Sequence, residues 1–350
     1  METMKRLTVF GPRDARFETV EKPKATGDMV VAKVLRVGVC ATDQSIYTGE
    51  SSFIRSGEIV FPTRFGHEWV GIVESVGPEV KNVKPGEYVY ADNFVSCGNC
   101  EECRSGRLSR CKHTRSVGTV NIWDGCYAEY MQMPERHIYK LPSELSLDEG
   151  ALIEPASIAY DAFKGTNLTK DDTVAVFGTG AIGMISVWLA KYYGAGRVIL
   201  VGRNDGKLEI GKAVGADCVI NSKNEDPVAK LLSMTGGEGV NLVIETSGAA
   251  SALRESILAT RSHGRISIIS FYERDVDSLP IDKLVLGCIS IVGAAGCYMN
   301  APEVCEIMRK NPVKLTPVVT HRIPFQDTLS VFERESEYRP TKIKAMITFD

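Results

Sequence analysis

The chain has 350 residues, and its 41 Lys and Arg against 44 Asp and Glu give a formal net charge of −3. Hydrophobic residues make up 44% and charged residues 24%, which is ordinary for a globular protein of about two domains. The slight acidity argues against a nucleic-acid partner, and no run of about 18 apolar residues predicts a membrane-spanning helix.

The ten cysteines are the unusual feature of the composition. The chain begins without the apolar core of a signal peptide, so we expect a cytoplasmic protein and no disulfide framework. The cysteines then either pack in the core or bind metal, and their spacing distinguishes the two.

Residues 1 to about 155 are predicted to be rich in β-structure. Short β-branched runs such as 29–39 and 70–76 alternate with Gly and Pro, a pattern typical of a barrel or sandwich. No long helix is predicted before Leu147.

Four residues of this part could bind a metal ion together. They are Cys40, His67, Glu68 and Glu154, which offer one sulfur, one nitrogen and carboxylate oxygens. Such a mixed set suits a catalytic zinc that keeps one position open. Each residue alone also has an ordinary structural explanation, such as a core thiol or a loop carboxylate.

Four further cysteines follow one another at metal-ligand spacing. Cys97, Cys100, Cys103 and Cys111 form a C-x2-C-x2-C-x7-C pattern, which favours a structural zinc held by four thiolates. An iron–sulfur cluster is the competing interpretation. The other cysteines have no partner at such spacing, and we expect them to be small buried residues: Cys126, Cys218, Cys288, Cys297 and Cys305.

Beyond Glu154 and Pro155, predicted strands and helices alternate, which indicates a parallel sheet with crossover helices. The predicted strands are 173–177, 198–201, 218–220, 242–245 and 266–270, and the predicted helices are 181–193, 205–214, 227–234 and 249–259. A helix over 302–310 and a strand over 343–349 are predicted near the C-terminus.

The turn after the strand 173–177 carries the sequence G-x-G-x-x-G and leads into a helix, which is the context of a dinucleotide-binding turn. Gly178 allows the turn, Gly180 lets a pyrophosphate approach the backbone, and Gly183 packs helix against strand. The first helical residues, Ala181 and Ile182, then present their N–H groups to the pyrophosphate.

The end of the next strand indicates the type of dinucleotide. A site for NAD usually has Asp or Glu there, but this strand ends in Gly202, Arg203 and Asn204. Gly202 leaves room for a 2′-phosphate, which Arg203 can bind and Lys207 can reach. The sequence therefore favours NADP, and the nearby Asp205 leaves NAD possible.

Three motifs in this order resemble the zinc-containing medium-chain dehydrogenase/reductase family along essentially the whole chain. They are the run Gly66-His67-Glu68-Trp69-Val70-Gly71 followed by Gly77, the four-cysteine loop, and the glycine turn. The resemblance implies an α/β fold with a GroES-like catalytic domain (1–155 and 288–350) and a Rossmann domain (156–287) around a shared active site.

The resemblance also assigns roles at the second metal-capable set. It implies that Cys40, His67 and Glu154 bind a catalytic zinc, with Glu68 as a fourth ligand or one that exchanges with water. Asp43 falls where a carboxylate orients the zinc-binding histidine. With the structural site, the chain would bind two zinc ions.

Other roles follow from the same resemblance. Thr42 falls at the hydroxyl that passes the substrate proton outward, and Lys344 where a basic residue contacts the cofactor pyrophosphate. Ser247 falls near the nicotinamide. Ser45 stands where many relatives have a histidine of the proton relay, so the relay's route is open.

A glutamate ligand at position 154 in place of a cysteine is similar to the pattern of the sorbitol dehydrogenase branch and its threonine dehydrogenase cousins. This implies hydride transfer between NAD(P) and a polyol, cyclitol or sugar-derived secondary alcohol, in a homodimer or homotetramer. A threonine dehydrogenase-like enzyme and a non-catalytic dinucleotide-binding zinc protein are the alternatives. Residues that could line the substrate pocket are Tyr47, Thr119, Asn121, Trp123 and Tyr272.

Overall fold

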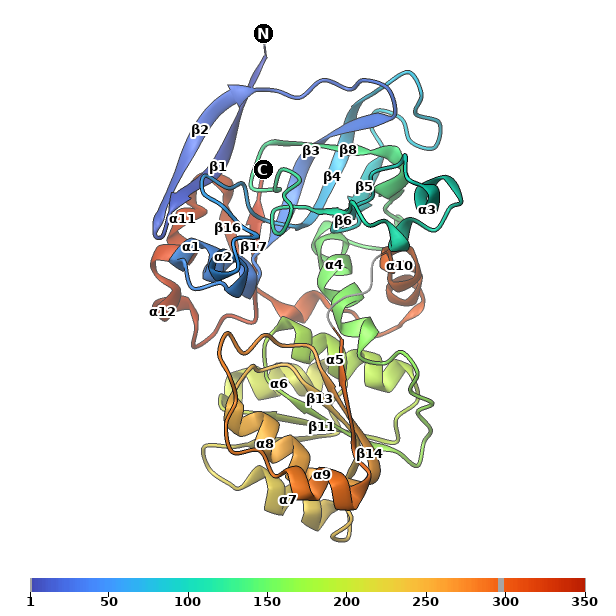
Figure 1. Ribbon diagram of the computed structural model, residues 1–350, viewed down its shortest axis with the longest axis vertical. Helices are drawn as coiled ribbons and strands as arrows, with labels where there is room; N and C mark the ends of the chain where they lie inside the picture. Colours follow the sequence, from blue (N-terminus) through green and yellow to red (C-terminus); the bar gives the residue numbers. More distant parts are fainter. Residues whose placement is uncertain (1, 295–298, 350) are drawn as a thin grey trace.

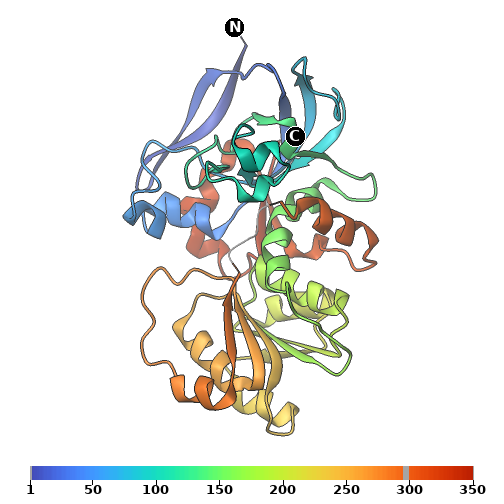
Figure 2. The same ribbon diagram turned by 45° about the vertical axis from the view of Figure 1, so that its right-hand side comes forward.

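The computed structural model describes residues 2–294 and 299–349, which form two lobes joined by the helix α4 (Leu147–Asp161) (Figure 1). The upper lobe in Figure 1 is rich in β-structure, and we call it the β-rich lobe. The lower lobe has a parallel sheet with helices on both faces, and we call it the α/β lobe. The view in Figure 2 shows the same division from a second side.

The β-rich lobe contains a seven-stranded sheet in the order β16-β17-β3-β4-β5-β9, with β8 paired to β3. Its strands are β3 (Met29–Gly38), β4 (Glu68–Val76), β5 (Tyr88–Ala91), β8 (Tyr130–Pro134), β9 (Ile138–Lys140), β16 (Val319–Pro324) and β17 (Lys344–Thr348). Two separate two-stranded sheets are formed by β1 (Thr3–Gly11) with β2 (Asp14–Glu21), and by β6 (Phe94–Val95) with β7 (Arg115–Ser116).

Short helices lie around this sheet. Because β16 and β17 are strands of the sheet, the C-terminal segment lies in the same lobe as the first strands (Figure 1). The helices are α1 (Ala41–Thr48), α2 (Ser52–Arg55), α3 (Glu101–Arg104), α10 (Ala301–Lys310), α11 (Leu329–Glu333) and α12 (Glu335–Tyr338). Single 3-10 turns occupy Leu108–Arg110, Glu135–His137, Thr316–Val318 and Phe325–Asp327.

The α/β lobe contains a six-stranded parallel sheet in the order β12-β11-β10-β13-β14-β15, as the alternation of strands and helices predicts. The strands are β10 (Thr173–Phe177), β11 (Arg197–Gly202), β12 (Cys218–Asn221), β13 (Val240–Glu245), β14 (Thr260–Ile268) and β15 (Ser290–Gly293). The helices are α5 (Ala181–Tyr192), α6 (Asp205–Ala213), α7 (Pro227–Met234), α8 (Ala250–Ala259) and α9 (Ile281–Gly287).

Helix α4 spans Glu154 and Pro155, where the sequence pattern changes from β-rich to alternating strands and helices. Ser146 caps it and accepts a hydrogen bond from the backbone N–H of Glu149, and Pro155 lies within the helix. One hydrophobic core runs past α4 and contains Val70 of the β-rich lobe as well as Val176 of the α/β lobe. A core that crosses the seam holds the two lobes together.

One expected boundary differs from the structure. The strand β15 extends the parallel sheet beyond residue 287, where the sequence placed the end of the Rossmann domain. Helix α1 was not predicted, because eight residues give a weak periodic signal, but it is too short to contradict the expectation that no long helix precedes Leu147. In the described residues, no helix is long and apolar enough to cross a membrane.

Candidate active site

Three side chains from two neighbouring elements form the first metal-binding group. Cys40 stands at the N-terminus of α1, and His67 and Glu68 lie at the start of β4. Their ligand atoms all lie within 4.8 Å of one another. The register that pairs Gly38 at the end of β3 with Glu68 brings these segments together.

A buried carboxylate stands behind His67. Asp43 is fully buried, and its Oδ1 lies 3.5 Å from His67 Nδ1. The other oxygen, Oδ2, accepts hydrogen bonds from the Cys40 backbone N–H at 3.0 Å and from the Tyr127 hydroxyl at 2.9 Å. Burial disfavours a charged imidazole, yet Asp43 and then Cys40 raise the pKa of His67 well above its usual value. The negative charges around the His67 ring therefore stabilise a positive charge on it.

Glu68 is bound to a buried lysine. The Lys344 ammonium donates to both carboxylate oxygens of Glu68, at 2.7 and 2.6 Å, and to the Val39 carbonyl at 3.2 Å. Lys344 and Glu68 are 4% and 1% exposed. These three acceptors match the three N–H groups of an ammonium, so the structure directs Lys344 to Glu68. Its expected contact with the cofactor pyrophosphate stays a prediction.

Glu154 approaches the same place from α4. It is buried, and its Oε1 accepts a hydrogen bond from the Asn93 amide at 2.8 Å. Burial raises the pKa of Glu154 to about 7, with His67 opposing and Glu68 adding to the shift. Glu154 faces the cavity of the metal-binding group but stands outside the set of atoms within 4.8 Å.

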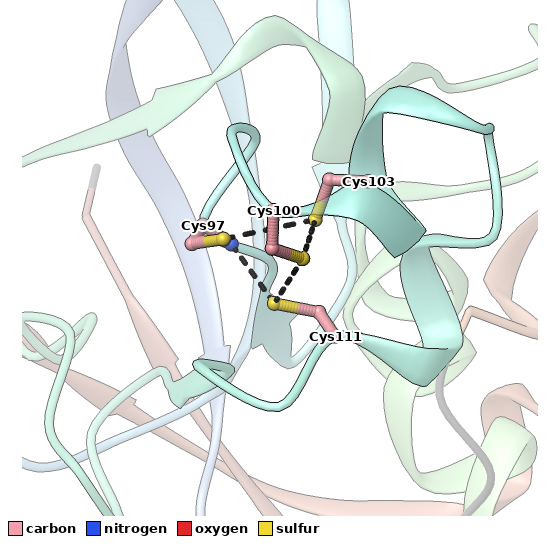
Figure 3. Close-up of side chains that lie close together, drawn as sticks. All are labelled: Cys97, Cys100, Cys103 and Cys111. Carbon is pink, nitrogen blue, oxygen red and sulfur yellow. Dashed lines mark hydrogen bonds between the residues drawn. The ribbon is translucent and has the colours of Figure 1, made fainter.

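The four cysteines of the loop around α3 turn their sulfur atoms toward one another (Figure 3). The sulfur atoms of Cys100 and Cys103 are 3.4 Å apart, those of Cys97 and Cys103 are 3.8 Å apart, and those of Cys100 and Cys111 are 3.9 Å apart. Four sulfur ligands on a tetrahedral zinc would be about 3.8 Å apart, given Zn–S bonds of about 2.3 Å.

Backbone N–H groups in this loop stabilise a negatively charged sulfur atom. Cys111 Sγ accepts hydrogen bonds from the backbone N–H groups of Cys97 at 3.3 Å and His113 at 3.4 Å. Burial opposes ionisation, but these hydrogen bonds lower the pKa of Cys111 to about 6. Gly98 has a φ of +78°, which allows the tight turn between the first two cysteines. The geometry fits a structural zinc.

The remaining cysteines only partly match the expectation of burial. Cys126 and Cys305 are buried as expected, whereas Cys218 is half-buried. Cys288 is exposed, because it follows the last turn of α9 in a left-handed conformation at the surface. Cys297 lies outside the described residues.

The glycine turn has the geometry that its sequence predicts. A Cβ at Gly178, where φ is +117°, would lie 2.4 Å from the Thr246 hydroxyl oxygen. A Cβ at Gly183 would lie 2.0 Å from the Gly178 carbonyl oxygen, so helix and turn touch there. A Cβ at Gly180 would meet nothing within 4 Å, which leaves open space at the N-terminus of α5, beside Ala181 and Ile182.

At the end of β11, the absence of a side chain at Gly202 has a specific cause. A Cβ there would lie 2.2 Å from Thr179 Cγ2, so Thr179 covers the position where an NAD site usually carries a carboxylate. Arg203 is exposed. The Asn204 side chain caps α6 by accepting from the Lys207 N–H at 3.0 Å.

A cavity of about 580 Å³ connects the metal-binding group with the glycine turn. It is lined from the β-rich lobe by Cys40, Thr42, Ser45, His67, Glu68 and Lys344, and from the α/β lobe by Gly180, Ala181, Ile182 and Ser247. The Ser45 hydroxyl donates to the Thr42 carbonyl at 2.9 Å, and the Ser247 hydroxyl to Glu245 at 2.5 Å. Zinc-binding and dinucleotide-binding residues therefore share one space.

Most residues expected in the substrate pocket lie elsewhere. Thr119 lines the cavity, but Tyr47 is buried against Phe332, and the Tyr272 hydroxyl donates to Glu245. Asn121 is exposed and Trp123 stacks on Arg115, both outside this lining. Lining residues that the sequence analysis missed include Phe53, Asn93, Phe94 and Ser116. They come from the short helix α2, the short strands β6 and β7 and the residue before β6, none of which a periodic pattern marks.

The donor sets at both sites fit zinc. Four thiolates close a structural site, whereas Cys40, His67 and Glu68 give the mixed set of a catalytic zinc with room for a further ligand. A zinc bound there would supply a Lewis acid. Asp43 holds His67 in position for it, and Lys344 holds Glu68.

Comparisons with known proteins agree with this arrangement. A family model described as "Alcohol dehydrogenase GroES-like domain" matches residues 26–143, and one described as "Zinc-binding dehydrogenase" matches residues 181–310. An L-threonine 3-dehydrogenase of Bacillus licheniformis is 34% identical over 92% of this chain and 92% of its own length. A sorbitol dehydrogenase of Bacillus subtilis is 29% identical over 99% of this chain and 97% of its own.

Among solved structures, 2R,3R-butanediol dehydrogenase of Bacillus subtilis has a TM-score of 0.87 at 27% identity, over 99% of this chain and 100% of that chain. The likeness in sequence and fold extends along nearly the whole length. The chain therefore belongs to the zinc-binding medium-chain dehydrogenases and is a zinc-dependent NAD(P) alcohol dehydrogenase.

Proposed function

We propose that this enzyme transfers a hydride between NADP and a polyol, cyclitol or other sugar-derived secondary alcohol, with the ketone as substrate in reverse. The observation that carries the proposal is the lining beside the metal-binding group. Uncharged hydrogen-bonding side chains gather there, namely Thr42, Ser45, Asn93, Ser116 and Thr119. Such groups suit the several hydroxyls of a polyol.

The proposed ligand set of the catalytic zinc is Cys40, His67 and Glu154, with Glu68 exchanging between the metal and Lys344. The buried position of Glu154 in the same cavity supports its role. Glu68 has a counter-charge in Lys344 when it does not bind the metal, which supports the exchange.

Thr42 is the proposed first member of the proton relay. It is half-buried in the cavity lining, three residues before Ser45. The Ser45 hydroxyl donates its hydrogen to the Thr42 carbonyl, and its oxygen lone pairs remain available to accept a proton from the Thr42 side chain. A water molecule or a ribose hydroxyl is the alternative second member.

The preference for NADP is also proposed. Thr179 occupies the space of a ribose-binding carboxylate, and Arg203 is exposed at the tip of β11. The Michaelis constant for NADP should be lower than that for NAD, and Arg203→Ala should reduce the difference. Equal use of both cofactors by the parent enzyme would refute this preference.

The deciding experiment for the substrate is a screen of NADPH and NADH oxidation over ketoses, inososes, sugar phosphates and simple ketones. We expect activity on unphosphorylated polyhydroxy ketones. Of the lysines in the cavity lining, Lys344 is held by Glu68, and Lys342 lies within electrostatic reach of Lys207 in α6, so neither is expected to bind a substrate phosphate. Activity confined to apolar ketones would contradict the proposal.

An amino alcohol such as threonine is the second candidate. A specific observation favours it: Glu50 lines the cavity and offers a carboxylate to a substrate ammonium group. The likeness to L-threonine 3-dehydrogenases points the same way. Oxidation of threonine that Glu50→Gln weakens, with xylitol and sorbitol inactive, would establish this alternative.

We also propose a homodimer that pairs through β15. This strand is the last of the six-stranded sheet, and all four of its residues are exposed, including Ile291 and Val292. Leu286 of the adjacent α9 is 85% exposed. An open edge with apolar neighbours can pair with the same edge of a second copy around a twofold axis.

A further inference from the structure

A segment near the C-terminus, residues 339–342, is fastened to the turn between β11 and α6. The Asn204 side-chain amide donates to the Pro340 carbonyl at 3.0 Å, and the Lys207 ammonium donates to the Arg339 carbonyl at 2.8 Å. These bonds join the β-rich lobe to the strand end where the adenosine ribose of a dinucleotide is expected.

The contact gathers cationic side chains from both lobes. Lys207 comes from the α/β lobe, where Arg203 precedes it by four residues, whereas Arg339 and Lys342 come from the β-rich lobe. Positive charge is concentrated at the place expected for the ribose. A 2′-hydroxyl does not need such charge, whereas a 2′-phosphate binds to it.

Lys342 is the member of this group that faces the shared cavity. It is half-buried, and within the described part of the chain its ammonium has no hydrogen bond or ion pair. Burial lowers the pKa of Lys342, and Lys344 and Arg339 lower it further against the opposing effect of Glu335. The charges around Lys342 are therefore mixed, and its half-buried ammonium, which has no hydrogen bond in the described part of the chain, can bind an anionic ligand.

Lys207 experiences the same charges from the other lobe. Burial and then the charges of Lys342 and Arg339 lower the pKa of Lys207. Its ammonium uses one N–H for the Arg339 carbonyl, so two remain for a ligand. The repulsion between Lys207 and Lys342 decreases when an anion lies between them.

We propose that Lys342 and Lys207 bind the 2′-phosphate of NADP from opposite lobes, an inference that rests on the proposed NADP preference. The phosphate would then be recognised by the segment 339–342 as well as by the β11 tip. NAD, which carries a hydroxyl at this position, leaves both ammonium groups without an anion.

The test uses two adenosine fragments that differ by the 2′-phosphate, 2′,5′-ADP and 5′-AMP, bound to the zinc-loaded enzyme in calorimetric titrations. We expect the parent enzyme to bind 2′,5′-ADP more tightly. Lys342→Gln should weaken 2′,5′-ADP binding about tenfold through the loss of a charge-assisted hydrogen bond, and leave 5′-AMP binding unchanged. Lys342→Arg, which keeps the charge, should retain most of the affinity.

Lys170→Gln is the matched control, because Lys170 is exposed just before β10, at the opposite end of the sheet. If the parent enzyme does not prefer 2′,5′-ADP, the proposed NADP preference fails and this inference fails with it. If the preference exists and persists in Lys342→Gln, only the inference is overturned. An equal loss for both fragments also overturns it, because Lys342 would then act on a shared part of the ligand.

Discussion

His67 is positioned at one end by Asp43 and at the other by the metal-binding group. The Asp43 oxygen that faces Nδ1 at 3.5 Å has no other partner among the described side chains. This contact leaves the Nε2 atom of His67 for the metal. Polar contacts therefore hold His67 in position, and its replacement tests whether the enzyme needs it.

Replacing His67 by Ala should therefore remove the catalytic zinc and leave the structural one. Zinc content should fall from two to one per chain, and turnover should fall by about a thousandfold or more, as several kcal/mol of charge stabilisation are lost. Metal analysis, steady-state kinetics and the melting temperature measure this. His113→Ala, a change at an exposed histidine, should keep both ions and activity. Retained turnover in His67→Ala would refute the assignment.

The pair of Glu68 and Lys344 is the second feature at this scale. Both side chains are buried, so loss of the cation leaves a carboxylate without compensation. Lys344→Met should lower the free energy of unfolding by about 3 kcal/mol, and Glu68→Gln in the same chain should restore much of it.

Urea denaturation of the four members of this mutant cycle measures the coupling between Glu68 and Lys344. Lys140→Met serves as the control, because its pairing with Glu87 is exposed and should contribute at most about 1 kcal/mol. Additive effects of the two buried substitutions would show that the pair does not act as a unit.

At the scale of elements, the strand β10, the glycine turn and α5 form one unit whose three glycines have different physical roles. A side chain at Gly178 or Gly183 would collide with atoms of the protein, whereas a side chain at Gly180 would enter empty space. The motif predicted all three positions, since its spacing fixes where a strand turns into a helix.

Gly180→Ala and Gly183→Ala should therefore have separable effects. Alanine at Gly180 meets no atom of the protein, so folding should be normal while NADPH binding weakens about tenfold. Alanine at Gly183 would lie 2.0 Å from the Gly178 carbonyl oxygen and should cost about 1–3 kcal/mol of stability. NADPH fluorescence and urea denaturation separate the two. Destabilisation by Gly180→Ala would contradict this division.

Other elements show where sequence patterns were insufficient. The regular strands and helices of the α/β lobe agree with prediction to within a few residues, apart from β14, which begins at Thr260 and not at 266, and α9 and β15, which were missed. Helix α1 was not expected, although it carries Asp43 and presents Thr42 and Ser45 to the cavity. Its local sequence is short and polar, so tertiary contacts decide its conformation.

At the scale of the whole molecule, the exposed edge of the parallel sheet has the largest consequence. Val292→Lys places a charge on β15, where a second copy would pair. We expect this variant to be a monomer with its α/β lobe intact, while the parent enzyme is a dimer. Light scattering after gel filtration measures the mass, and Val313→Lys, at an exposed apolar site away from β15, is the control. A dimeric Val292→Lys enzyme would refute pairing through this edge.

The sequence by itself determined the chemistry that this protein can perform. Four cysteines within one loop and a glycine turn between a strand and a helix are local patterns, so their spacing predicts the structural zinc group and the dinucleotide turn before the chain folds. The catalytic set combines the Gly-His-Glu run with the distant Cys40 and Glu154, and its roles were predicted from the resemblance to the family.

Only the tertiary structure decided how distant residues share the space between the lobes. It placed Lys344 on Glu68, Asn93 on Glu154 and Lys342 opposite Lys207, pairs that no sequence pattern connects. Contacts of this kind depend on sheet register and on the packing of α4 across the seam. Both are set by hydrophobic burial over the whole molecule, which a local motif does not record.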